Sequence, residues 1–291
     1  MIKLKKLIKS LSDERWNIGF IQNDMASILS GEELCVKWLK HDSKYSWFAD
    51  PFILDVTDNE IHVLVEEYYK PIQRGRISRL IIDRYSYELK QKDVVLELRT
   101  HLSFPAIIRK EKDVFIYPEN GESGELNLYQ YFPESNKCVK IETILSEAVA
   151  DAIIARVNGE DMLFCTKKTN PNGNELYVFT QDESGRYLEK ERYTFDENIA
   201  RMAGDFFEYN GKLYRPTQEC NVQYGHAVTL QEITREGGKF KFKEVRRMYS
   251  VHPKLNVGMH TFNMYKGMIV TDALGFDNMW IRKVLKVLCM K

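Results

Sequence analysis

The stretch FADPFILDVTDNEIHVLVEEYY, residues 48–69, decides the fold because it contains one complete structural unit. A small, turn-like start leads into a short apolar strand, a polar turn and a second apolar strand, which is the pattern of a β-hairpin. Four later segments repeat this shape: LSFPAIIRKEKDVFIYPEN (102–120), VADAIIARVNGEDMLFCTKK (149–168), RMAGDFFEYNGKLYRPTQEC (201–220) and VGMHTFNMYKGMIVTDAL (257–274). The chain therefore consists of repeated β units.

The spacing of the repeat matches one blade of a β-propeller. When the five segments are aligned, the equivalent positions are Asp50, Phe104, Asp151, Gly204 and His260, with steps of 54, 47, 53 and 56 residues. A four-stranded blade takes roughly 50 residues. Further strand-like pieces occur at 77–87, 94–100, 125–132, 175–181, 226–235 and 242–249. We predict an all-β, five-bladed β-propeller; an unrelated β-sandwich with chance spacing is the alternative.

The two ends of the chain differ in charge from its middle. The 291 residues have no net charge, yet residues 1–11 and 279–291 carry four basic residues each and no acid. Their apolar residues share one helical face, which predicts short basic amphipathic helices at 2–11 and 280–290. The predicted division is an N-terminal basic segment with a first strand (1–44), the propeller (45–278) and a basic C-terminal tail (279–291).

These basic ends suggest a membrane partner. The two ends of a closed propeller meet in one blade, so the two helices together form a patch suited to an anionic membrane surface. Packing of the helices against the side of the propeller is the alternative.

The composition restricts the partners and the compartment. Without the basic ends, the chain has 34 basic and 42 acidic residues, which argues against a nucleic acid partner. Five scattered cysteines without a C-x-x-C pair predict reduced thiols. The N-terminus lacks the pattern of a secretory signal, and no run approaches the ~18 apolar residues of a membrane span. We expect a cytoplasmic location, peripheral on the inner membrane face.

The candidate site residues follow from the propeller geometry. The first strand of each blade lines the central channel, and the starts of these strands converge at one mouth, where ligands bind. Carboxylates there can act as general base, general acid or nucleophile. The predicted catalytic residues are Asp50, Asp151, Glu119 and Glu67. The predicted substrate-binding residues are His101, Arg201, Arg215, Gln218, Glu219 and His260, with Glu66 and Asp272 as further strand-end candidates.

Ordinary structural roles compete with these assignments. Asp50 precedes a proline, where aspartate is a common turn residue, and Glu67 could pair with Arg76. No metal and no cofactor is predicted, because the sequence has no H-x-x-H or C-x-x-C zinc spacing, no glycine-rich phosphate loop and no G-x-S-x-G elbow.

Several short motifs occur in one order along the chain: FADPFI, VEEYY with GRI at 75–77, HLSFP, YPEN with ELNLY, ADAII with LFCTK, GKLYRPTQEC with YG at 224–225, and MHTFN. Together, over residues 45–275, they resemble the bacterial relatives of the N-terminal domain of glucosamine inositolphosphorylceramide transferase. The resemblance implies a five-bladed propeller similar to glycoside hydrolase family 43, and a place in surface-polysaccharide or lipopolysaccharide gene clusters.

The resemblance also implies roles for individual residues. Asp50 corresponds to the general base of the hydrolases, and Asp151 to the aspartate that tunes their acid. The chain departs from the relatives' RPAQDC motif, because Thr217 and Glu219 replace its alanine and its aspartate. No glutamate in the fourth blade matches the general acid of the hydrolases.

Three functional hypotheses remain open. The first is a glycosyltransferase or related carbohydrate-active transferase in surface-polysaccharide biosynthesis (capsule or O-antigen), acting on a glycan or an activated sugar. The second is a family 43-like glycoside hydrolase, in which Asp50 activates water and a glutamate protonates the leaving oxygen. The third is a non-catalytic glycan-binding propeller in a polysaccharide assembly complex. The missing signal pattern and the basic ends favour the first.

Overall fold

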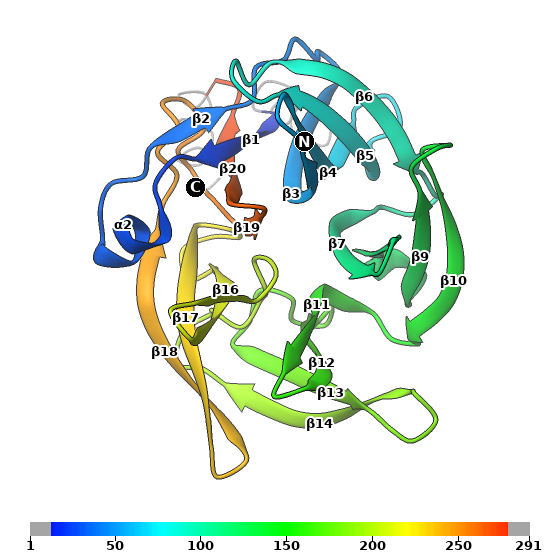
Figure 1. Ribbon diagram of the computed structural model, residues 1–291, viewed down its shortest axis with the longest axis vertical. Coiled ribbons are helices and arrows are strands. Elements are labelled where there is room, and N and C mark those ends of the chain that lie inside the picture. The colour runs from blue at the N-terminus through cyan, green and yellow to red at the C-terminus, as the bar shows by residue number, and fades with distance from the viewer. Residues whose placement is uncertain (1–12, 279–291) are drawn as a thin grey trace, which may run out of the picture.

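The computed structural model describes residues 13–278 and confirms the predicted all-β, five-bladed propeller. Five four-stranded antiparallel sheets stand around a central channel, and the chain passes from one sheet to the next around the ring (Figure 1). The predicted helices at 2–11 and 280–290 lie outside the described residues. In the described part, no helix is long and apolar enough to cross a membrane.

The blades follow one another in chain order. Blade I contains β3 (Ser46–Val56), β4 (Glu60–Tyr69), β5 (Arg74–Asp83) and β6 (Leu89–Leu96). Blade II contains β7 (Ser103–Lys110), β8 (Asp113–Glu119), β9 (Leu126–Phe132) and β10 (Lys137–Leu145). Blade III contains β11 (Val149–Val157), β12 (Glu160–Lys167), β13 (Glu175–Gln181) and β14 (Tyr187–Thr194). Blade IV contains β15 (Phe207–Tyr209), β16 (Lys212–Glu219), β17 (Ala227–Glu236) and β18 (Lys239–Met248).

Blade V closes the ring with strands from both ends of the described chain. It contains β19 (Phe262–Tyr265), β20 (Met268–Phe276), β1 (Glu14–Ile21) and β2 (Val36–Trp38), and β1 pairs with β20 from Glu14↔Phe276 to Ile21↔Ile269. Two short helices, α2 (Met25–Ser30) and the 3₁₀ helix η1 (Gly121–Ser123), interrupt the sheets. The fifth blade therefore includes residues of the segment 1–44, and the two ends of the described chain meet in one blade.

Aromatic side chains fill the space between neighbouring blades. Phe52 of blade I meets Phe104 of blade II edge-on at 5.0 Å between ring centroids. Phe207 and Phe262 pack at 5.7 Å between blades IV and V. Burying one such ring contributes roughly 1.5–3 kcal/mol, so this packing holds the sheets in a fixed ring around the channel.

The equivalent positions of the repeat have an unusual backbone in three blades. Asp50, Phe104 and Asp151 have φ angles of 49°, 45° and 44°, and each lies at a break in the pairing of the first two strands of its blade. Non-glycine residues rarely adopt positive φ, and such residues concentrate at functional sites.

The backbone N–H groups at these positions link neighbouring blades. The N–H of Asp50 donates to Asp272 of blade V at 3.2 Å, and that of Phe104 donates to Asp50 at 3.0 Å. The N–H of Asp151 donates to Glu119 of blade II at 3.0 Å. Acidic side chains thus join blades V to I, I to II and II to III at the channel mouth.

Candidate functional site

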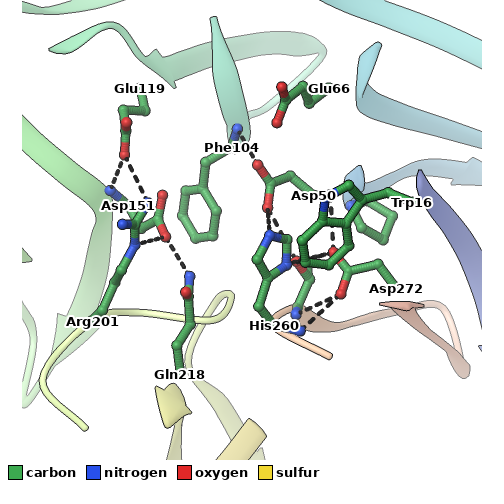
Figure 2. A network of polar contacts seen from close by, with 12 residues as sticks. Trp16, Asp50, Glu66, Phe104, Glu119, Asp151, Arg201, Gln218, His260 and Asp272 are labelled. Atoms are coloured by element: carbon green, nitrogen blue, oxygen red, sulfur yellow. Dashed lines mark hydrogen bonds and ion pairs between the residues drawn. The ribbon is translucent and has the colours of Figure 1, made fainter. Parts of the chain in front are cut away.

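A cavity of about 1070 Å³ lies at the mouth of the channel, where the first strands begin and the second strands end. Its wall combines aromatic rings with charged and polar groups. The aromatic members are Trp16, Trp47, Tyr68, Tyr224 and Phe276. The charged and polar members are Asp13, Glu14, Glu66, Lys70, Gln73, His101, Ser103, Glu119, Lys168, Asn172, Arg201 and His260. Figure 2 shows two groups of polar side chains at this mouth.

The first group is the imidazole cluster, which we define as Asp50, His260, Thr261 and Asp272. His260 Nδ1 lies 2.7 Å from an Asp272 oxygen, and His260 Nε2 lies 3.6 Å from an Asp50 oxygen. The Thr261 hydroxyl is 2.8 Å from Asp272 and 3.2 Å from Asp50. The backbone N–H groups of His260 and Thr261 also donate to Asp272. An imidazole therefore bridges two buried carboxylates.

Burial and charge displace the pKa values of this cluster. Burial raises the pKa of Asp50 to about 7, and the nearby carboxylates of Glu66 and Asp272 add to this effect against the attraction of His260. Burial alone would lower the pKa of His260, but the charges of Asp272 and Asp50 raise it to about 9. At neutral pH His260 is thus an imidazolium that faces the cavity.

Aromatic rings cover His260. Trp16 of β1 stacks on the imidazole at 4.0 Å between ring centroids, with 24° between the planes. Tyr224, from the loop between β16 and β17, meets the imidazole edge-on at 5.3 Å. The N-terminal strand therefore completes the site by supplying the ring above His260.

The second group is the guanidinium cluster, which we define as Glu119, Asp151, Arg201 and Gln218. Arg201 Nε donates to Asp151 at 2.6 Å, and Arg201 Nη2 lies 3.4 Å from Glu119. Gln218 donates its amide to the same Asp151 oxygen as Arg201. Outside the cluster, Lys168 Nζ donates to Glu119 at 2.6 Å.

The two carboxylates of the guanidinium cluster respond in opposite directions. Burial raises the pKa of Asp151 to about 7, because desolvation and the charge of Glu119 outweigh the attraction of Arg201. Burial also acts to raise the pKa of Glu119, but Arg201 and Lys168 lower it to about 2. Glu119 is therefore an anion at neutral pH, held between two cations.

A third feature of the wall is the pair Glu66 and His101. His101 Nε2 lies 3.0 Å from Glu66 Oε1, and His101 Nδ1 accepts the N–H of Gly75 at 3.0 Å. Because Nδ1 accepts, the proton of the imidazole is assigned to Nε2, which donates to Glu66. A Cβ on Gly75 would clash with the backbone carbonyl of Leu102 and would lie 2.7 Å from Glu66 Oε1, so a glycine is needed beside this pair.

The structure divides the ten predicted site residues into three groups. Glu119, His101, Arg201 and His260 line the cavity. Asp50, Asp151 and Gln218 are buried just behind these four residues and contact them, but they do not themselves line the cavity. The remaining three are Glu67, Arg215 and Glu219, which lie away from the wall.

Glu67 is held in the interior of blade I. Its side chain is fully buried and accepts hydrogen bonds from Ser46, Arg76, Ser78 and Lys92. Although burial acts to raise its pKa, these donors lower it to about 2. Glu67 is therefore a permanently charged structural partner in the folded protein.

Arg215 and Glu219 are also held by their own neighbours. The fully buried Arg215 donates to Gln231 at 2.7 Å and to the carbonyl of Ala200. Glu219 accepts the N–H of Asn221 at 2.5 Å and lies 2.7 Å from His226 Nδ1.

The pairing of the strands singles out Glu66, which the sequence offered only as a further strand-end candidate. Ala49 pairs with Glu66 in blade I, and Ser103 pairs with Glu119 in blade II. Each of these residues directly precedes a residue with positive φ, so Glu66 and Glu119 occupy equivalent positions. A comparison of the two hairpins at this register was the available signal for choosing Glu66 over Glu67. Trp16 and Lys168 carried no such signal.

One group of described residues meets the geometric requirement for a metal ion. Asp50, His260 and Asp272 each offer one ligand atom, and these atoms lie within 4.8 Å of one another. The same atoms already take part in the hydrogen bonds of the imidazole cluster. This geometry is compatible with a metal ion and with hydrogen bonds alone, so the absence of a metal stays a prediction.

The fold is a five-bladed propeller, similar in its architecture to solved structures of several glycoside hydrolases. A GH43 β-xylosidase/α-arabinofuranosidase from a compost microbial metagenome matches with a TM-score of 0.56, over 80% of this chain and 91% of that chain, at 10% identity. A GH43_1 enzyme from Xanthomonas citri in complex with xylotriose matches with a TM-score of 0.54 over 80% and 88%, at 11% identity. A Bombyx mori GH32 β-fructofuranosidase in complex with sucrose also scores 0.54, over 78% and 56%, at 9% identity.

The family follows from the sequence comparison. Residues 30–273 match the family model described as glucosamine inositolphosphorylceramide transferase 1, N-terminal, and the chain belongs to this family. The transferase of that name from Arabidopsis thaliana is 26% identical over 227 residues, which cover 75% of this chain and 29% of the plant protein. The protein of that name from Oryza sativa subsp. indica is 27% identical over 210 residues, 69% of this chain and 28% of its own length. The chain thus spans less than a third of these relatives.

Proposed function

We propose that the protein is a carbohydrate-active enzyme, a glycosyltransferase or related transferase in surface-polysaccharide biosynthesis. The observation that carries the proposal is the cavity at the channel mouth, where aromatic rings alternate with carboxylate, imidazole and guanidinium groups. Sugars present apolar C–H faces to aromatic rings and hydroxyl groups to charged hydrogen-bond partners. The names of the plant relatives, which are transferases, favour transfer. A cytoplasmic location is part of this proposal.

Three groups of the wall have defined roles in the proposed transfer. Glu66 takes the proton of the acceptor hydroxyl while His101 holds one of its oxygens. The imidazolium of His260 stabilises negative charge on the leaving group, because its pKa of about 9 keeps it protonated at neutral pH. Arg201 and Lys168 orient hydroxyl or phosphate oxygens through the N–H groups that do not bind Glu119, Asp151 or Asn172.

The geometry gives less support to the hydrolase alternative. Water activation by Asp50 requires an oxygen in contact with cavity water, whereas its two oxygens lie 3.0 Å from the N–H of Phe104 and 3.2 Å from the hydroxyl of Thr261. Glu219, the nearest sequence candidate for a general acid, binds His226 outside the cavity wall. The alternative of a non-catalytic glycan-binding propeller predicts sugar binding without turnover, and turnover can be measured.

The test of catalysis measures nucleotide release from a panel of sugar nucleotides in the presence of membrane extract. Glu66→Gln keeps the shape of the side chain and removes the base, so we expect release to fall by about 10²–10⁴-fold. Glu160→Gln, at the exposed start of β12, is the matched control and should release nucleotide as the wild type does. Equal rates for wild type and Glu66→Gln, or no release from any donor, would contradict transfer.

The test of sugar binding uses the aromatic pair on the cavity wall. Trp47 and Tyr68 stack at 4.8 Å with only 8° between their planes. We expect Tyr68→Ala to weaken glycan binding by about tenfold, because it removes one ring of the pair. Tyr85→Ala removes a ring that is 74% exposed on a turn far from the cavity and should leave affinity unchanged. Titration calorimetry with the glycan that supports turnover decides between these outcomes.

A further inference from the structure

The two ends of the described chain lie together at the cavity mouth. Asp13 and Phe276 both line the cavity, and the N–H of Asp277 donates to the carbonyl of Asp13 at 2.9 Å. Two ion pairs fix these ends: Arg15 with Asp277 at 2.8 Å, and Lys70 with Asp13 at 2.9 Å. The chain therefore enters and leaves the propeller beside the opening of the site.

The sequence adjoining these ends is basic. Residues 1–12 and 279–291, which lie outside the described part, contain eight lysines and arginines and no acid. Each basic residue close to an anionic lipid surface contributes about 1 kcal/mol of attraction. Eight basic residues without an acid are thus attached to the chain ends at the cavity mouth.

Exposed apolar side chains surround the same place. We define the mouth rim as Tyr45, Val222, Tyr224, Tyr249 and Val251, which are 65%, 73%, 37%, 50% and 38% exposed. They belong to the loops before β3, between β16 and β17, and after β18, on the blades that flank and include blade V. Contacts tie these loops to the mouth, since the carbonyl of Tyr45 accepts the N–H of Lys70 at 2.8 Å and Tyr224 lines the cavity.

Large apolar residues elsewhere on the surface do not share this arrangement. Tyr85 is on the turn after β5 and Phe132 is the last residue of β9, both at the blade ends away from the mouth. Val139, Ile141 and Leu188 are on the outer strands β10 and β14. Half of the ten exposed large apolar residues in the described part therefore belong to the loops around the chain ends. Apolar side chains beside basic segments are the pattern by which proteins lie on membranes.

We propose that this face docks onto an anionic lipid bilayer, with the cavity mouth against the membrane, and that the cavity takes the head group of a lipid-borne sugar or acceptor. The inference rests on the proposed function for its substrate class. The basic ends supply the electrostatic attraction, and the mouth rim enters the interface. An amphiphile then places its polar head in the cavity while its acyl chains stay in the bilayer.

The first test measures co-sedimentation of the full chain with vesicles of phosphatidylcholine, with and without phosphatidylglycerol. We expect binding to the anionic vesicles, and about tenfold weaker binding for Val222→Asp/Val251→Asp. The matched control is Val139→Asp/Ile141→Asp, which places the same charges on similarly exposed residues of β10. Failure of the wild type to bind, or an equal loss in both double variants, would overturn the docking face.

The second test measures orientation on the membrane. An environment-sensitive fluorophore is attached at Val222→Cys or at Val139→Cys, in a chain that also carries Cys35→Ser and Cys289→Ser. On anionic vesicles we expect a blue shift from position 222 and none from position 139. A shift from position 139 alone, or equal shifts from both positions, would show that another face meets the bilayer.

A third measurement separates this inference from the proposed function. Nucleotide release is compared with membrane lipids presented in vesicles and with a soluble oligosaccharide acceptor. We expect release with vesicles to fall about tenfold in the rim variant and to stay unchanged in the β10 variant. Turnover with the soluble acceptor alone would refute the lipid-borne substrate and leave the transferase intact. Docking through the mouth rim without turnover on any acceptor would refute the transferase instead.

Discussion

The imidazole cluster and the guanidinium cluster hold buried carboxylates at the same channel mouth by different means. In the imidazole cluster the cation is His260, which carries charge only while it binds a proton, and it bridges Asp50 and Asp272. In the guanidinium cluster the cation is Arg201, whose charge is permanent, and it contacts Asp151 and Glu119.

This difference assigns distinct physical tasks to the two sides of the site. Arg201 anchors blade IV to blades III and II with a charge that does not change with pH. His260 sits under Trp16 between carboxylates whose net charge depends on the proton. One side is therefore a fixed electrostatic clamp, and the other is a proton-dependent element suited to acid–base or charge-stabilising work.

The largest expected effect comes from removing the fixed cation. Arg201→Met leaves the carboxylates of Asp151 and Glu119 buried without it, and breaking a buried pair in this way costs about 3–5 kcal/mol. We expect the free energy of unfolding, measured by urea denaturation, to fall by this amount. Arg186→Met, on an exposed turn of blade III, is the control and should change it by less than ~0.5 kcal/mol.

A double variant shows whether the buried charge causes the loss. Asp151→Asn removes one of the two carboxylates that Arg201 neutralises, so Arg201→Met/Asp151→Asn should recover part of the stability. If the double variant is as unstable as the sum of the single variants, the two side chains are not coupled and the clamp description is wrong.

A smaller effect is expected from pH, and it belongs to the other cluster. The folded-state pKa of His260, about 9, lies above its ordinary value of 6.5, so its stabilisation is fully present below pH 6.5 and is lost as the pH rises through 9. Asp50, with a pKa raised to about 7, acts in the same direction at lower pH. Burial also raises the pKa values of Asp151 and Asp205 to about 7, and although burial acts to lower the pKa of His101, Glu66 raises it. The contribution of His260 between pH 7 and 9 is therefore isolated by comparison with a variant that lacks it.

Urea denaturation across this window tests the assignment. We expect the free energy of unfolding of the wild type to fall by about 1–3 kcal/mol between pH 7 and 9, and that of His260→Asn to change far less. His62→Asn, which removes a half-buried histidine of blade I, should retain the wild-type slope. If the free energy of unfolding falls equally with pH in His260→Asn and in the wild type, the titrating group is not His260.

The fold was predictable because its determinants are local and repeated. Each hairpin carries its own alternation and turn, and the repeated spacing of Asp50, Phe104 and Asp151 marks the start of each first strand. These three residues share positive φ in the structure. The sequence also indicated that the chain ends meet in one blade, since a propeller can close only by joining its ends.

The site was predictable only in part because the local irregularities decide which side chains face the channel. The pairing of β3 with β4 shifts between Ala49 and Phe52, and an extra residue of this kind changes which neighbour points inward. In β4 itself successive side chains point to opposite faces, so Glu66 faces the cavity and the adjacent Glu67 faces the interior of the blade. The burial of Asp50 depends on His260, more than two hundred positions away, a contact that no local pattern encodes.

The smallest expected effect tests the hydroxyl that joins the imidazole cluster. Thr261 Oγ1 lies 2.8 Å from Asp272 and 3.2 Å from Asp50, and its single proton can serve only one of them at a time. Thr261→Val keeps the shape and removes this donor, and we expect a loss of about 1.5 kcal/mol, the usual value for a hydrogen bond to a charged group.

The effect of Thr261→Val on the pKa of His260 distinguishes loss of the hydroxyl from a simple packing defect. Without the hydroxyl, Asp272 and Asp50 depend more strongly on the imidazolium, so the pKa of His260 should rise further. NMR titration of the His260 ring protons measures this change directly. Thr229→Val, a buried threonine of β17 outside the cluster, is the control and should leave that titration unchanged. A fall in the pKa of His260 would mean that the Thr261 hydroxyl does not compete with the imidazole for the carboxylates. The imidazole cluster and the guanidinium cluster would then differ only in whether the cation is a histidine or an arginine.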